Sequence, residues 1–226
     1  MPLHVLGVSR SVDVAGSSRP WHRGEEHEVR WVVEGPLAAA AVESPCESFG
    51  PLEQARLLAD IHARITIRPL RYGTVLPQTA AVRDFLSRRG ATLLRDLLRI
   101  EGTGEIGLRV VLLGPSTPSS PEREDDNGLP AMSPRQYLAS RRQCYAWKDQ
   151  LERQTQTVTG SLVQAVEGLY RQWRLLASTT PATVRLAFLV QRNHWEAFRR
   201  RLETAEPNDA CRRYTLLGPW PPYSFV

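Results

Sequence analysis

The chain closes on Gly218-Pro219-Trp220-Pro221-Pro222-Tyr223-Ser224-Phe225-Val226, a stretch with three aromatic residues and three prolines. Chain ends are usually polar and frayed. Because proline fixes φ and lacks an amide hydrogen, this stretch excludes a regular helix and a central strand. We expect a stiff, extended arm that lays Trp220, Tyr223 and Phe225 on an apolar surface, either of its own domain or of a partner.

Patterns of strand and helix precede this arm in the second half of the chain. Residues 184–190 alternate as a strand, and residues 212–217 form a last strand before the arm. Apolar residues between 134 and 177 recur at three- and four-residue steps in two groups, which predicts an antiparallel helical hairpin. With a strand at residues 106–113 and a short helix at 193–202, the order predicts a split βαβ layout with an enlarged first crossover.

The first half also mixes strands with helices. A long amphipathic helix starts near Pro77 and stops at Gly102, with leucines on one face and arginines on the other. Residues 9–26 and 114–130 are rich in polar residues, glycine and proline, which predicts loops. The remaining elements are strands at residues 3–8, 29–33, 37–42 and 65–70 and a helix at residues 52–63.

Four sequence blocks, in the same order, resemble the gas-vesicle GvpF/GvpL family. They are Pro69-Leu70-Arg71-Tyr72-Gly73-Thr74-Val75, the Gly102 to Val110 stretch GTGEIGLRV, Tyr137-Leu138, and the closing GPWPPYSFV. Each block alone is weakly or moderately specific. Together they span most of the chain, and the long closing block makes the resemblance strong.

The resemblance implies an α+β fold of two domains, the second a modified ferredoxin-like fold with the inserted helical hairpin. We place the domains at residues 1–103 and 104–226, with the helical insert at 134–177 and the aromatic tail at 218–226. It further implies a minor structural or assembly protein of gas vesicles. Such a protein would bind the small hydrophobic shell protein through its first domain, with other gas vesicle accessory proteins as further partners, and assist nucleation or growth of the vesicle.

Composition fits a globular cytoplasmic protein. Of 226 residues, 42% are hydrophobic, yet no apolar run approaches the ~20 residues that cross a bilayer, and no secretory signal is visible. Three isolated cysteines indicate a reducing compartment. The net charge of +5 lies mostly after residue 103, and all basic residues but Lys148 are arginine. We read this surplus as a solvated basic face, with nucleic-acid binding as the alternative.

No motif predicts catalysis, a cofactor or a metal site. Residues 102–107 match G-x-G-x-x-G, but here a helix precedes and a strand follows, the reverse of a dinucleotide site. His22 and His27 are five residues apart in a predicted loop, whereas metal ligands on a helix are four apart. His62 and His194 lack a cluster at ligand spacing and are predicted to be surface or satisfied core residues. Glu101 and Glu105 flank a turn, where carboxylates usually cap or form ion pairs.

Arg71 and Tyr72 interrupt an apolar segment. The structural interpretation is an arginine that ties a strand end to a carboxylate or to helix carbonyls, and the functional interpretation is a contact point for a partner. A general protein-interaction scaffold that docks through the helical hairpin remains the alternative function. A nucleic-acid module would differ from both in a steep salt dependence of its affinity.

Overall fold

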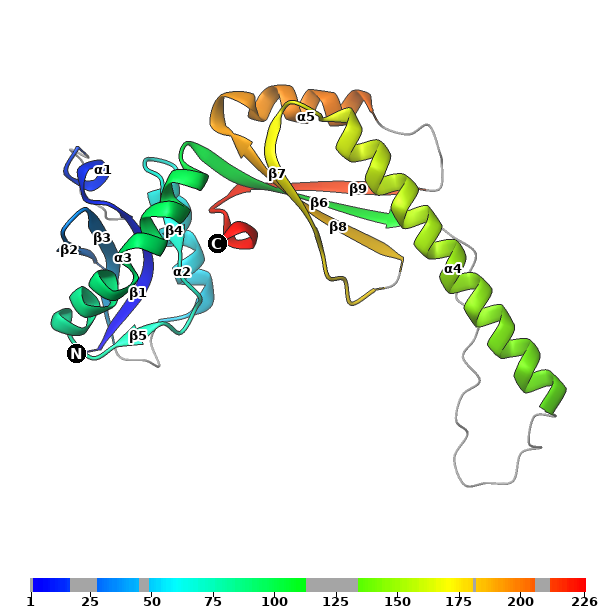
Figure 1. Ribbon diagram of the computed structural model, residues 1–226, viewed down its shortest axis with the longest axis horizontal. Coiled ribbons are helices and arrows are strands. Elements are labelled where there is room, and N and C mark those ends of the chain that lie inside the picture. The colour runs from blue at the N-terminus through cyan, green and yellow to red at the C-terminus, as the bar shows by residue number, and fades with distance from the viewer. Residues whose placement is uncertain (1, 17–27, 45–48, 113–133, 181, 206–211) are drawn as a thin grey trace.

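The computed structural model describes residues 2–16, 28–44, 49–112, 134–180, 182–205 and 212–226, and within them two antiparallel sheets lie side by side (Figure 1). The first sheet has the strand order β2-β3-β1-β4, and β5 also pairs with β1. The second has the order β7-β8-β6-β9. The strands are β1 (Leu3–Arg10), β2 (Val29–Glu34), β3 (Leu37–Glu43), β4 (Arg68–Pro69), β5 (Val75–Leu76), β6 (Thr103–Leu112), β7 (Tyr170–Leu176), β8 (Thr183–Gln191) and β9 (Arg212–Trp220).

The helices pack on these sheets, and none of those described is long and apolar enough to cross a membrane. They are α1 (Ser11–Ala15), α2 (Pro51–His62), α3 (Thr79–Ile100), α4 (Pro134–Ala165) and α5 (Trp195–Thr204). Two 3₁₀ turns, η1 (Arg192–His194) and η2 (Tyr223–Phe225), complete the described elements.

Both faces of the first sheet are covered by helices. Alternate residues of a strand point to opposite faces, so Val5 of β1 joins the core under α3 while Leu6 joins the core under α2. The strand β3 is buried on both faces, which explains why its sequence reads as a continuous run of alanine and valine. The apolar stripe of α3 that covers its face comprises Val82, Leu86, Leu93, Leu97 and Ile100.

The second sheet is covered on one face by α4 and α5. The inward residues Ile106, Leu108 and Val110 of β6 pack in one cluster with residues of both helices. On the opposite face Arg109 and Arg185 are cross-strand neighbours, and both are exposed. Part of that face packs against the first sheet, because Ala187 and Leu189 of β8 belong to the same core as α3. One hydrophobic core is therefore shared by the two sheets.

The expected helical hairpin at residues 134–177 is wrong. The structure has one helix, α4, of 32 residues, followed by the edge strand β7. The apolar spacing continues through Leu169, Trp173 and Leu176, which favoured a second helix. However, Gly168 adopts φ +82, a left-handed conformation that ends a helix and that glycine adopts readily. Beyond it, β7 pairs with β8, and tertiary pairing overrides the helical spacing.

The strand β7 is also the fourth strand that the sequence did not reveal. With it, the second half has the order β-α-β-β-α-β, which is the element order of ferredoxin-like folds. The first half repeats this order up to β4, with the same arrangement of strands in its sheet. Two short elements also differ from expectation: α1 lies in a segment predicted as loop, and β5 was not predicted.

The close approach of β6 to α2 and α5 requires glycine at position 104. A Cβ added there would lie 2.7 Å from Cζ2 of Trp195 and 3.1 Å from Nε2 of His62. We expect Gly104→Ala to lower the free energy of unfolding by about 1–3 kcal/mol in urea denaturation, the usual cost of overpacking.

The matched control is Gly90→Ala on α3, where an added Cβ would meet nothing within 4 Å. In the interior of a helix this change should stabilise the protein by about 0.5–1 kcal/mol. Equal effects of the two substitutions would contradict the packing at position 104.

Candidate functional site

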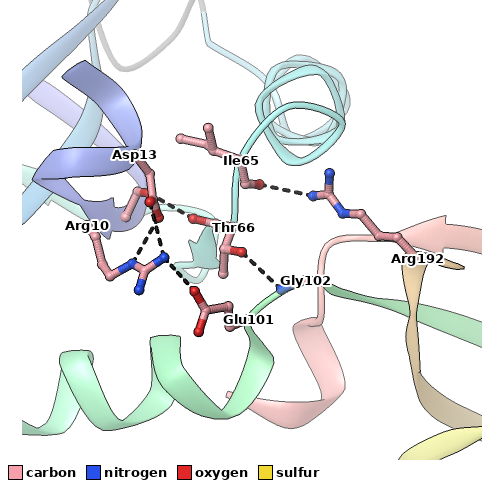
Figure 2. A network of polar contacts seen from close by, with 8 residues as sticks. Arg10, Asp13, Ile65, Thr66, Glu101, Gly102 and Arg192 are labelled. Carbon is pink, nitrogen blue, oxygen red and sulfur yellow. Dashed lines mark hydrogen bonds and ion pairs between the residues drawn. The ribbon is translucent and has the colours of Figure 1, made fainter. Parts of the chain in front are cut away.

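A polar cleft lies where the end of α3 and the start of β6 meet β1 and α1. Its volume is about 630 Å³, and charged side chains from several elements line it, among them Arg10, Asp13, Glu101 and Arg192. Figure 2 shows these residues converging from the two sheets around Thr66 and Gly102. The cleft therefore marks the joint between the two sheets.

The charged side chains on one side of this cleft form ion pairs with each other. Arg10 Nε donates to Asp13 Oδ2 at 3.0 Å, and Arg10 Nη2 donates to Glu101 Oε1 at 2.5 Å. The hydrogen bond to Asp13 is the main cause that raises the pKa of Arg10 above its ordinary value. The contact to Glu101 joins β1 to the end of α3, so this triad fastens elements that are far apart in sequence (Figure 2).

On the other side, Arg192 of the second half reaches the end of α2. Its guanidinium donates to the carbonyl oxygens of His62, Ala63 and Ile65, with distances of 3.2 Å to the last two. Helix ends leave unpaired carbonyls and a partial negative charge, which a cation satisfies. Burial lowers the pKa of Arg192. A further hydrogen bond, from the Gly102 amide to Thr66 Oγ1 at 3.2 Å, crosses the same joint.

The buried His62 lies behind this contact. Its side chain is 4% exposed, and neither ring nitrogen has a hydrogen-bond partner in the described part of the chain. Burial, followed by the nearby charge of Arg192, lowers the pKa of His62 to about 4. The sequence predicted a surface or satisfied core residue here, and the structure corrects this to a buried, neutral imidazole without a protein partner.

This arrangement of paired charges is suited to holding the two sheets together. The cations of the triad and of Arg192 are engaged by carboxylates or by backbone carbonyls. Among the described residues no group of three or more His, Cys, Asp or Glu side chains could hold a metal ion. His22 and His27 lie outside the described residues.

The C-terminal tail closes the joint from the side of the second sheet. The Phe225 ring is 0% exposed and belongs to the core that contains Leu97 and Leu189. The guanidinium of Arg174 lies 5.3 Å from the centre of this ring. Ser224 donates to the buried Glu105 twice, through its amide and its hydroxyl, each at 2.7 Å.

The other two aromatic residues of the tail are only partly covered. Trp220 is 46% and Tyr223 is 44% exposed. Burial of the Tyr223 hydroxyl and the charge of Glu105 nevertheless raise the pKa of Tyr223 to about 12. The tail is extended only in its first part: β9 runs to Trp220, and the 3₁₀ turn η2 follows.

Arg71 and Tyr72 lie on an exposed turn between β4 and β5, away from the cleft. The Tyr72 hydroxyl donates to the carbonyl of Phe49 at 3.0 Å, while its ring is 47% exposed. Arg71 is exposed, and its carbonyl accepts from the Thr74 hydroxyl. Neither residue lines the cleft, and Tyr72 is hydrogen-bonded to Phe49, a buried residue of the core under α2.

Sequence reasoning found some of the joint and missed the rest. The ion pair of Glu101 is confirmed, and Glu105 caps the tail turn. Arg10 and Arg192 were missed, because nothing near them in sequence marks a contact made across more than 90 positions.

Comparisons with known proteins show which family and which solved structures this chain resembles. A family model described as "Gas vesicle synthesis protein GvpL/GvpF" matches residues 5–226. The crystal structure of the gas vesicle protein GvpF from Anabaena sp. PCC7120 is similar, with a TM-score of 0.74 and 17% identity over 99% of this chain and 97% of that one. GvpF from Microcystis aeruginosa gives a TM-score of 0.72 and 14% identity, over 99% and 98% of the two chains. No curated protein sequence matches the chain.

The buried Phe225 ring predicts a large effect of truncation. We expect Phe225→Ala to lower the free energy of unfolding by about 3–5 kcal/mol, the usual cost of removing a buried phenyl ring. Leu217→Ala on β9 is the control, because Leu217 is 44% exposed and should change stability by less than about 0.5 kcal/mol. Similar losses for both variants in urea denaturation would show that the tail is not part of the core.

The low pKa of His62 predicts acid sensitivity. In the unfolded chain His62 binds a proton near pH 6.5, and in the folded protein it binds one only near pH 4. The contribution of His62 to the free energy of unfolding is therefore complete above pH 6.5 and is lost as the pH falls from 6.5 to 4. The loss should reach roughly 3 kcal/mol for this group. His62→Leu should remove that component, which urea denaturation between pH 7 and 4 measures. Parallel pH profiles of the two proteins would refute the neutral buried state.

Proposed function

Because the chain belongs to the GvpL/GvpF family of gas vesicle synthesis proteins, we propose that it binds the small hydrophobic shell protein and assists nucleation or growth of the vesicle. The observation that carries this proposal is the match of the family model to residues 5–226. The proposed role is non-enzymatic. It is supported by a joint whose charged groups are already engaged with each other or with backbone carbonyls.

The physical demand on such a protein is to cover apolar surface. A shell protein whose wall faces gas exposes apolar residues before assembly, and large exposed apolar patches aggregate. A partner can shield such a segment by adding it to the exposed edge of a sheet, where backbone hydrogen bonds provide affinity. The task needs shaped surface and exposed backbone groups, and it needs no reacting side chain.

We place the shell-protein contact on the first half, residues 1–103, which we regard as one domain, with residues 104–226 as the other. The strand β2 is an edge strand of the first sheet, and no described strand pairs with its outer side. Val33 on this strand is 47% exposed. The exposed turn with Arg71 and Tyr72 belongs to the same half and offers a cation and an aromatic ring, residue types that often anchor interfaces.

A pair of matched substitutions in the full-length chain tests this placement. Val33→Lys puts a charge on the edge strand β2, and Leu175→Lys puts one on the edge strand β7, where Leu175 is 56% exposed. A charge on an edge strand blocks pairing with a further strand. We expect Val33→Lys, and more weakly Arg71→Glu, to reduce co-purification with the shell protein about tenfold or more, equivalent to about 1.4 kcal/mol.

Leu175→Lys should leave that co-purification unchanged. The opposite pattern, with loss only in Leu175→Lys, would assign the contact to the second half. If neither variant nor wild type captured the shell protein, the proposed function itself would be wrong. Circular dichroism of each variant separates loss of binding from loss of fold.

A further inference from the structure

The N-terminal half of α4 projects from the body of the protein as a separate arm (Figure 1). We define the arm as residues 135–150, none of which is buried. Along α4, packing against the core of the second sheet begins at Leu151, and the described residues before it belong to none of the hydrophobic clusters. In proteins most of the stability of a helix comes from tertiary packing of its apolar face, and the arm has such packing only at its anchored end.

The apolar stripe of α4 does not stop where the sheet stops. Leu151, Val158 and Leu162 pack against the second sheet. Residues seven apart lie on nearly the same face of a helix, so Cys144 and Tyr137 continue the line of Leu151 and Val158 into the arm. Trp147, four residues before Leu151, flanks the same line. The apolar stripe therefore continues for about four turns beyond Leu151, where its packing against the other described residues ends.

Aromatic residues give this stripe the composition of an interface. Tyr137 is 48%, Leu138 56% and Tyr145 54% exposed. The Arg141 guanidinium lies 5.8 Å from the centre of the Tyr137 ring and 5.4 Å from that of Tyr145, and it donates to the Tyr145 hydroxyl at 2.9 Å. These contacts hold the two rings in place along the helix, which lowers the conformational entropy that a partner must remove.

The charge of the arm selects the chemistry of its partner. Four basic residues, Arg135, Arg141, Arg142 and Lys148, stand against one acidic residue, Asp149. Paired helices use flanking charges to choose partners, and like charges across an interface are unfavourable. A second copy of the arm would place these cations against each other, whereas an acidic helix would neutralise them.

We propose that the arm of α4 binds an acidic amphipathic helix of another protein, which packs along Tyr137, Cys144 and Trp147. This surface is separate from the first half, to which the proposed function assigns the shell protein. The partner helix carries leucine-type residues at heptad spacing and glutamate or aspartate on the flanks of that stripe. It extends the seam that α4 already forms with the second sheet.

A pair of designed peptides tests this chemistry on the full-length protein. Each has about four heptads with leucine at the core positions. One has glutamate at the flanking positions, and the other has lysine. We expect fluorescence anisotropy to show tighter binding of the acidic peptide by about tenfold or more, and a weaker preference at high salt. Absence of binding by the acidic peptide, or equal affinity for both peptides, would overturn the proposal.

Charge reversal locates the site. The double substitution Arg141→Glu and Arg142→Glu should weaken binding of the acidic peptide by about tenfold or more and should improve binding of the lysine peptide. The matched control reverses Arg199 and Arg200, two exposed residues of α5, and should leave both affinities unchanged. Equal losses in the two double variants would show unspecific attraction to a basic protein and would overturn the proposal.

Other occupants of the arm have distinguishable signatures. Dimers in sedimentation that are lost in the Arg141→Glu, Arg142→Glu variant would assign the arm to a second copy. Single-stranded DNA that competes fully with the acidic peptide would assign it to nucleic acid. A tenfold gain in peptide affinity on neutralising Glu122, Glu124, Asp125 and Asp126 would assign it to the acidic run of this chain. Each of these results would overturn the acidic partner helix. The shell-protein assay is independent of all of them, so the two proposals can fail separately.

Discussion

The burial of one aromatic ring from the end of the chain makes the two sheets a single packing unit. Phe225 joins a core that also contains residues of β1, β3, α3 and β8, so the first sheet, its helix and the second sheet share one apolar interior. A buried ring contributes several kcal/mol, and a hydrogen bond to a charged group contributes about 1.5–3 kcal/mol. The apolar wedge therefore stabilises the joint together with the polar contacts of Arg10, Arg192 and Ser224, and the directions of these contacts orient it.

The sequence predicted those parts of the fold that local patterns determine. The strands β1 to β4 of the first sheet, the helices α2 and α3, and the strands β6, β8 and β9 follow from alternation, from helical spacing and from turn residues. The predicted hairpin is wrong because Trp173 and Leu176 of the edge strand β7, with Leu169 just before it, keep helical spacing by chance, and an edge strand needs no strict alternation. In that region Gly168 was the informative residue, since its left-handed backbone ends the helix.

The joint was predictable only in part, for a related reason. The aromatic tail and the turn carboxylates are visible as local oddities in the sequence. An arginine that caps a helix 130 residues away has no such signature, because its partners are backbone carbonyls, which every residue possesses. Likewise, nothing local distinguishes a histidine that becomes buried and neutral from one on the surface. Contacts to the backbone across the chain require the three-dimensional structure.

The two halves use one strand order, and they differ most in the connection after their first strand. In the first half that connection contains α1, of five residues, and in the second half it contains α4, of 32. A helix anchored at one end can grow at the other without disturbing either sheet. Each additional heptad would carry its tip about 10 Å farther. The length of α4 therefore sets the distance between the body of this protein and the second protein that the arm binds.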